Sequence, residues 1–134
     1  VTSFLAKQAV KSSSKLNVKA IITDSHTGRT ARYLAAFRGT STVFAICYRE
    51  RVMRMLSLSY GVWAVHQPWN DSRRGYFYDA LNQLIKSGRI TRDNMVAYLS
   101  GSFGEGGGTT FLEINNVGKV LDANSNYTLP TFQE

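Results

Sequence analysis

Cysteine and histidine are scarce in this chain. Its 134 residues include one cysteine, Cys47, and two histidines, His26 and His66. A single thiol excludes an internal disulfide and is typical of a protein from a reducing compartment. Three potential ligands scattered along the sequence do not make a metal cluster. We therefore expect a cytoplasmic protein whose chain holds no metal.

Long apolar runs are also missing. No run approaches the roughly 18–20 residues that a membrane-spanning helix needs, and no apolar signal region follows Val1. We therefore expect no membrane partner. Because the chain does not begin with methionine, we interpret Val1 as the cut end of a longer chain. Its length predicts that residues 1–134 form a single domain.

Signatures of catalysis are absent from the sequence. The spacing G-x-x-x-x-G-K of a P-loop does not occur, and neither does the dinucleotide pattern G-x-G-x-x-G. We find no nucleophile–base pair, no zinc motif and no kinase or ATPase signature. The sequence therefore predicts no catalytic residue and no cofactor in this chain itself.

Acidic residues are outnumbered by basic ones. Sixteen Lys and Arg residues face nine Asp and Glu residues, for a net charge of +7. The basic residues are spread along the chain, and the three lysines Lys7, Lys11 and Lys15 are interpreted as the solvated face of a helix. No nucleic-acid-binding signature is present. The charge favours anionic ligands in general, and a basic nucleic-acid-binding domain remains an alternative that a steep salt dependence would reveal.

Apolar strands alternate with helical patterns along most of the chain. We expect strands near residues 20–22, 42–47, 62–65, 94–99 and 110–115, and helices near residues 2–16, 31–38, 49–59 and 77–85. This alternation predicts right-handed βαβ units and a parallel sheet. The last strand follows one loop after its predecessor, so it should run antiparallel. The tail after Asn116 is interpreted as irregular or edge structure.

The stretch from Lys19 to Phe37 is the strongest candidate for a binding site. A buried strand, a polar turn and a helix follow one another, which directs backbone N–H groups and the positive end of the helix dipole at the turn. Hydroxyl groups and one guanidinium lie in the turn and suit a phosphate. The candidate residues are Ser25, Thr27, Gly28, Arg29 and Thr30. Ordinary helix capping is the alternative explanation for the same residues.

Two later loops have unusual compositions. The segment from residue 67 to 75 carries Trp69, Arg73 and Arg74 in a polar context, which suits either a packing anchor or a stacking wall for a ligand. Residues 100–110 contain five glycines, so this loop is either slack or shaped for close approach of the backbone to another group.

The sequence resembles the C-terminal domain of pyruvate kinase. The family pattern T-x-S-G-R-[ST]-A appears as residues 25–31, SHTGRTA, and R-x-L-x-L-x-x-G-V appears as residues 54–62, RMLSLSYGV. Two blocks with a strand between them at the right spacing are more specific than either block alone. The resemblance covers nearly the whole chain.

The resemblance implies a three-layer α/β/α sandwich with a mixed five-stranded sheet that ends in an antiparallel strand. It implies a non-catalytic fragment, because in this family a separate barrel domain transfers phosphate from phosphoenolpyruvate to ADP in glycolysis and holds the Mg and K ions. The C-terminal domain contacts that barrel, supplies subunit contacts in a tetramer and in many members binds an allosteric sugar phosphate. A stand-alone phosphosugar-binding module is the alternative.

The resemblance also implies roles for particular residues. One phosphate would lie on the turn formed by residues 25–30. A second would lie near Trp69, with Arg73 or Arg74 replacing the arginine that the family places where Tyr76 stands, and near the glycine-rich loop with Gly106, Gly107 and Gly108. Glu105 departs from the family pattern. A carboxylate that faces a phosphate is unfavourable, so either Glu105 points outward or the effector differs.

Overall fold

The computed structural model describes residues 1–25, 28–37, 41–67, 73–100 and 111–123, except for the side chains of residues 2, 25 and 73–76. Strands and helices alternate within these residues. The strands are β1 (Val18–Ser25), β2 (Thr42–Cys47), β3 (Val62–His66), β4 (Met95–Ser100) and β5 (Phe111–Asn116). The helices are α1 (Thr2–Lys15), α2 (Arg29–Ala36), α3 (Glu50–Leu56) and α4 (Arg73–Lys86), and a further helical turn covers residues 117–123.

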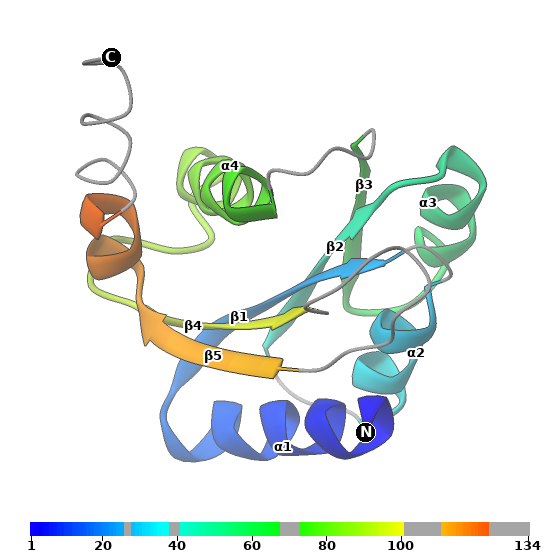
Figure 1. Cartoon of the computed structure of the whole chain (residues 1–134), viewed down its shortest axis with the longest axis horizontal. Coiled ribbons are helices and arrows are strands. Elements are labelled where there is room, and N and C mark those ends of the chain that lie inside the picture. The colour runs from blue at the N-terminus through cyan, green and yellow to red at the C-terminus, as the bar shows by residue number, and fades with distance from the viewer. Residues whose placement is uncertain (26–27, 38–40, 68–72, 101–110, 124–134) are drawn as a thin grey trace.

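The five strands form one mixed sheet. Their order is β3-β2-β1-β4-β5, with β1 parallel to both of its neighbours and β5 antiparallel to β4. Figure 1 shows α4 and residues 117–123 on one side of this sheet, and α1 and α2 on the other. The predicted three-layer α/β/α fold with a last antiparallel strand is therefore confirmed.

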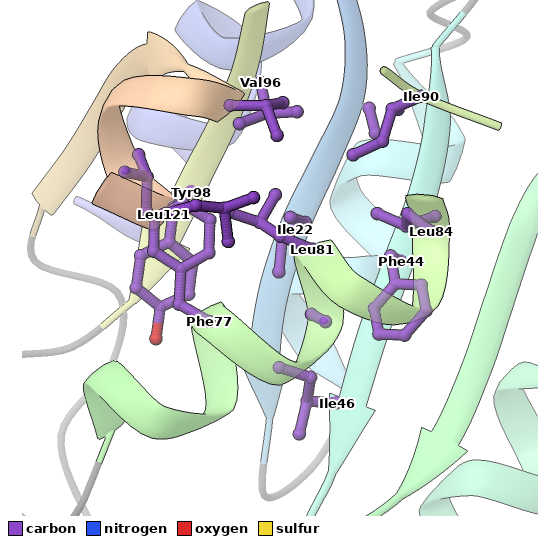
Figure 2. Close-up of a cluster of buried hydrophobic side chains, with 14 of the residues drawn as sticks. Ile22, Phe44, Ile46, Phe77, Leu81, Leu84, Ile90, Val96, Tyr98 and Leu121 are labelled. Atoms are coloured by element: carbon purple, nitrogen blue, oxygen red, sulfur yellow. The ribbon is translucent and has the colours of Figure 1, made fainter. Parts of the chain in front are cut away.

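Each face of the sheet carries its own core. Alternate residues of a strand point to opposite faces, so Ile22, Phe44 and Ile46 face α4, while Ile21, Val43 and Ala45 face α1, α2 and α3. On the α4 face, Phe77 stacks on Tyr98 with 4.3 Å between ring centroids, as Figure 2 shows. Burial on both faces explains the apolar run of β2 and the shorter apolar run of residues 20–22 within β1.

The opposite core is made of smaller side chains. Ala6 and Ala9 of α1 and Ala31 of α2 are completely buried there. Small residues allow the two helices to lie close to each other and to the sheet. None of the helices in the described residues is long and apolar enough to cross a membrane.

The ends of several elements differ from the sequence prediction. β1 continues to Ser25, beyond the apolar run, because Asp24 and Ser25 still pair with Ile46 and Cys47 of β2. α3 ends at Leu56 rather than near Ser59. Thr2 and Ser3 are residue types that often cap a helix, but the N-cap residue of α1 is Val1 and no side chain caps the helix.

The interpretation of residues 117–123 as irregular structure is also wrong. Val117, Val120 and Leu121 recur at helical spacing and are buried against the α4 face of the sheet. The helix is fixed at its start by a hydrogen bond from the Val117 N–H to the Asn94 carbonyl oxygen at 2.9 Å. Near its end, Arg92 pairs with Asp122 at 2.7 Å. The sequence contains this apolar spacing, but the Gly, Asn and Ser residues around it are typical of turns and favoured the irregular interpretation.

Cys47 at the end of β2 is completely buried, and burial raises the pKa of its thiol to about 11 from an ordinary value of 9.0. Because the thiolate is the reactive form, we expect the folded protein to react with Ellman's reagent far more slowly than the urea-unfolded chain. Stopped-flow absorbance near pH 8 measures both rates.

The raised pKa of Cys47 also predicts a pH dependence of stability. The folded state holds the proton more tightly, so the stabilisation is complete below the unfolded pKa of 9.0 and is lost as the pH rises towards about 11. Urea unfolding of the wild type and of Cys47→Ala across this range gives the comparison. A wild-type decline that is unchanged in the variant would assign it to other groups.

Candidate functional site

The candidate site lies at the carboxyl edge of the parallel strands. α2 connects β1 to β2 on one face of the sheet, whereas α4 connects β3 to β4 on the other face. The chain therefore leaves in opposite directions on the two sides of the boundary between β1 and β4. In open α/β sheets, ligands bind outside the carboxyl ends of the strands at such a switch point.

Gly28 forms the entrance to α2 at this edge. It is the N-cap residue, it has a φ of +84°, and no side chain caps the helix there. The first helical hydrogen bond runs from the Arg32 N–H to the Gly28 carbonyl oxygen at 3.0 Å. Gly28 is buried against α3, because a Cβ placed on it would meet Met55 Cε at 3.0 Å and Val52 Cγ1 at 3.2 Å. Glycine is thus favoured by its backbone conformation, and an added Cβ would also force the Met55 and Val52 side chains to shift.

Replacement of Gly28 by alanine should therefore cost more stability than replacement of a glycine that has only the same conformation. Gly61 is the matched control, with a φ of +80° and nothing within 4 Å of the place that an added Cβ would occupy. We expect Gly61→Ala to lower the free energy of unfolding by about 1 kcal/mol, and Gly28→Ala by about 2–3 kcal/mol. Urea unfolding of both variants measures the difference. Equal losses would show that contact with α3 contributes nothing.

Arg29 and Thr30 are the first two residues of α2. The Arg29 side chain is exposed, and its guanidinium carbon lies 5.7 Å from the centroid of the Tyr33 ring, one helical turn away. Thr30 is only 7% exposed. The first turn of α2 contains no acidic residue, so the positive end of the helix dipole and the Arg29 charge reinforce each other. This arrangement suits a negatively charged group.

A carboxylate that the sequence analysis did not assign to the site lies beside it. Asp24 is near the end of β1, and its carboxylate accepts hydrogen bonds from the Tyr48 hydroxyl at 2.5 Å and the Ser100 hydroxyl at 2.8 Å. The three residues lie at the carboxyl ends of β2, β1 and β4. Tyr48 and Ser100 are both buried. The bonds hold the three central strand ends together just before the turn that leads to α2.

Several predicted site residues are outside the described part of the structure. Thr27, Trp69 and the three glycines Gly106, Gly107 and Gly108 are among them, as are His26 and Glu105. Only the backbone is described for Ser25, which ends β1, and for Arg73 and Arg74, which begin α4. The structure therefore brings Gly28, Arg29 and Thr30 together at one helix start and does not test the proposed second phosphate position.

A cavity of about 890 Å³ lies at the opposite edge of the sheet. Its lining includes Ala36 at the end of α2, Thr42 at the start of β2 and Gly61 before β3. It is thus at the far end of α2 from Gly28. Among the described residues, no three His, Cys, Asp or Glu side chains group as metal ligands.

Comparison with known families gives one consistent result. Residues 4–115 match the family model described as the alpha/beta domain of pyruvate kinase. The chain is 34% identical over 117 residues to a pyruvate kinase of Borreliella burgdorferi, which covers 85% of this chain and 24% of that protein. It is 26% identical over 121 residues to a pyruvate kinase of Bacillus licheniformis, which covers 90% of this chain and 21% of that protein.

Solved structures share the fold. A Cryptosporidium parvum pyruvate kinase in complex with ADP superposes with a TM-score of 0.80 at 24% identity, over 87% of this chain and 24% of that one. A second structure of the enzyme from the same organism gives a TM-score of 0.77. The chain thus spans about a quarter of the length of the proteins that it matches.

Proposed function

This chain belongs to the pyruvate kinase alpha/beta domain family, and from that membership we propose that it is the C-terminal domain of a pyruvate kinase, serving effector binding and subunit assembly. The relatives are about four times longer. In this proposal, the additional length includes a catalytic barrel that transfers phosphate from phosphoenolpyruvate to ADP with Mg and K. The single buried thiol fits a cytoplasmic location.

The observation that carries the effector role is the start of α2. A glycine with positive φ, an exposed arginine and a buried threonine meet there, at the switch point of the sheet. A helix start binds phosphate through backbone N–H groups and the helix dipole, and an arginine adds charge-assisted hydrogen bonds. We propose that residues 25 and 27–30 hold a phosphate of a sugar-phosphate effector. Trp69, Arg73, Arg74 and residues 106–108 are proposed for a second phosphate.

Calorimetric titration tests the effector role. The wild-type domain should bind fructose bisphosphate or glucose 6-phosphate more tightly than inorganic sulfate, because a sugar phosphate adds contacts beyond one anion. A coupled assay of the same domain with phosphoenolpyruvate, ADP, Mg and K should show no turnover. If no phosphate ester binds, the start of α2 is ordinary capping and the effector role is excluded.

The assembly role rests on the edge strand β5. Its residues are only partly buried, and its outer edge has no neighbouring strand among the described residues. An unpaired edge is a template for pairing with another chain. We propose that it contributes to a homo-oligomer, a tetramer in the full-length enzyme. A strict monomer in sedimentation at high concentration would mean that the barrel is needed for assembly.

A stand-alone phosphosugar-binding module remains the second candidate, and only the phosphate site proposed at the start of α2 favours it. The gene distinguishes the two candidates, because a catalytic barrel encoded upstream of Val1 would identify a pyruvate kinase. The nucleic-acid alternative rests on net charge alone. It predicts an affinity for DNA or RNA that falls steeply with salt.

A further inference from the structure

Asp24 places a carboxylate at the carboxyl edge of the sheet, beside the start of α2. Its oxygens accept hydrogen bonds from the hydroxyl groups of Tyr48 and Ser100. Both donors are neutral, and none of the ion pairs between described residues involves Asp24. The carboxylate is therefore held in place by hydrogen bonds, but no cation in the described part of the chain balances its charge.

The Asp24 carboxylate also has unused capacity to accept hydrogen bonds. An ionised carboxylate offers about four lone-pair sites on its two oxygens. Each oxygen of Asp24 accepts one of the two bonds, Oδ2 from Tyr48 and Oδ1 from Ser100. Tyr48 is 8% exposed and Ser100 is 1% exposed, so both donors are fixed inside the protein, whereas Asp24 itself is only half-buried. The carboxylate thus has a fixed orientation and can accept a further bond from a ligand.

Asp24 and the start of α2 lie on opposite sides of the same sheet edge. Asp24 is two residues after Ile22, so its side chain points to the α4 face, whereas α2 packs on the other face. Four residues lead from Asp24 to Gly28, and a chain of that length spans at most about 14 Å. A ligand of hexose phosphate size at the switch point can therefore contact the helix start with one end and Asp24 with the other.

The two ends of such a ligand need opposite charges. The start of α2, with the helix dipole and the exposed Arg29, suits an anion, whereas the Asp24 carboxylate suits a positively charged donor. With a phosphate held at the start of α2, as the proposed function requires, we infer that Asp24 selects an effector with an ammonium group on the same small carbon skeleton as its phosphate. An amino-sugar phosphate is the class of ligand that matches.

Other ligand groups match Asp24 less well. A hydroxyl group can donate to the carboxylate, but it leaves the charge unbalanced. An anionic group is repelled, so a second phosphate of the effector would have to lie away from Asp24. A metal ion needs further ligands, and among the described residues no three His, Cys, Asp or Glu side chains group together. An ammonium group matches both the charge and the open acceptor positions.

Calorimetric titration with glucosamine 6-phosphate and glucose 6-phosphate near neutral pH tests this selection. The two ligands share the phosphate and differ at one position, where an ammonium group replaces a hydroxyl group. We expect the wild type to bind the amino sugar at least about tenfold more tightly. Asp24→Asn keeps the shape of the side chain without its charge, so the ratio of the two affinities should fall below about threefold in this variant.

Two control variants separate selection from phosphate binding and from net charge. Arg29→Ala should weaken the binding of both ligands and leave their ratio unchanged, because Arg29 acts on the phosphate. Asp79→Asn removes an exposed carboxylate of α4, so it has the same net charge as Asp24→Asn, and it should keep the wild-type ratio.

The outcomes distinguish this inference from the proposed function. If neither ligand binds, the phosphate site is excluded, and the selection with it. If both ligands bind but the wild type does not prefer the amino sugar, or if the preference survives in Asp24→Asn, only the selection by Asp24 is overturned. The wild-type ratio needs no variant, so it decides against the inference even where Asp24→Asn folds poorly.

Discussion

Arg29→Ala should weaken binding of a sugar phosphate by about ten- to a hundredfold. Arg29 is exposed at the first position of α2, where its charge and the helix dipole act in the same direction. Charge-assisted hydrogen bonds contribute roughly 1.5–3 kcal/mol each, and each 1.4 kcal/mol is about tenfold in affinity. Calorimetric titration with fructose bisphosphate and glucose 6-phosphate measures the loss.

Arg32→Ala is the matched control for Arg29→Ala. Arg32 is an exposed arginine one turn further along the same helix, so its removal changes the net charge equally but leaves the helix start intact. Loss of the contact between Arg29 and Tyr33 should lower stability by less than about 1 kcal/mol. Equal affinities of wild type and Arg29→Ala would rule out Arg29 as a phosphate ligand, and equal losses in both variants would reduce its effect to net charge.

Asp24→Ala should destabilise the folded protein by about 2–4 kcal/mol. The Asp24 carboxylate accepts hydrogen bonds from the Tyr48 and Ser100 hydroxyls, and each such bond to a charged acceptor is worth roughly 1.5–3 kcal/mol. Because Asp24 is only half-buried, water replaces part of the lost interactions and the net loss is smaller than the sum of the two bonds. Alanine removes both at the point where β2, β1 and β4 end together. Asp24→Asn keeps the shape and part of the hydrogen bonding, so its loss should be intermediate. Urea unfolding gives the order of the three proteins.

Asp79→Ala provides the comparison for this loss. Asp79 is exposed on α4 and takes part in no ion pair between described residues. Its replacement should change the free energy of unfolding by less than about 0.5 kcal/mol. If Asp24→Ala costs no more than Asp79→Ala, the carboxylate does not hold the strand ends together.

The architecture was predictable because the central strands β1, β2 and β4 are largely buried between the two helical layers. Runs such as residues 42–47 have no charged residue to interrupt them, and the helices between them bound each run clearly. The antiparallel β5 followed from a connection too short for a crossover helix. In contrast, residues 117–123 combine only three buried apolar side chains with turn-forming neighbours, so local composition pointed away from the helix that tertiary packing stabilises.

The candidate site was predictable only in part. Gly28, Arg29 and Thr30 are adjacent in the sequence, so their local pattern already indicated a helix start. The contacts of Asp24 connect the ends of three strands: Tyr48 directly follows β2, and Ser100, at the end of β4, is 76 positions away. No local pattern contains such a contact, because the sheet order alone brings these strand ends together. The packing of Gly28 on α3 was hidden for the same reason.

The position of β1 between β2 and β4 also constrains the order in which the sheet can form during synthesis. β1 can pair with β2 once both have been synthesised, but its other edge has no partner strand until β4, which begins at Met95, has been synthesised as well. At about 5–20 residues per second, the 76 residues from Asp24 to Ser100 take the ribosome roughly 4–15 seconds. During that interval a central, apolar strand of the domain has one unpaired edge. We therefore expect the nascent chain to misassociate chiefly through β1. This strand lies in the middle of the sheet and is buried once the fold is complete.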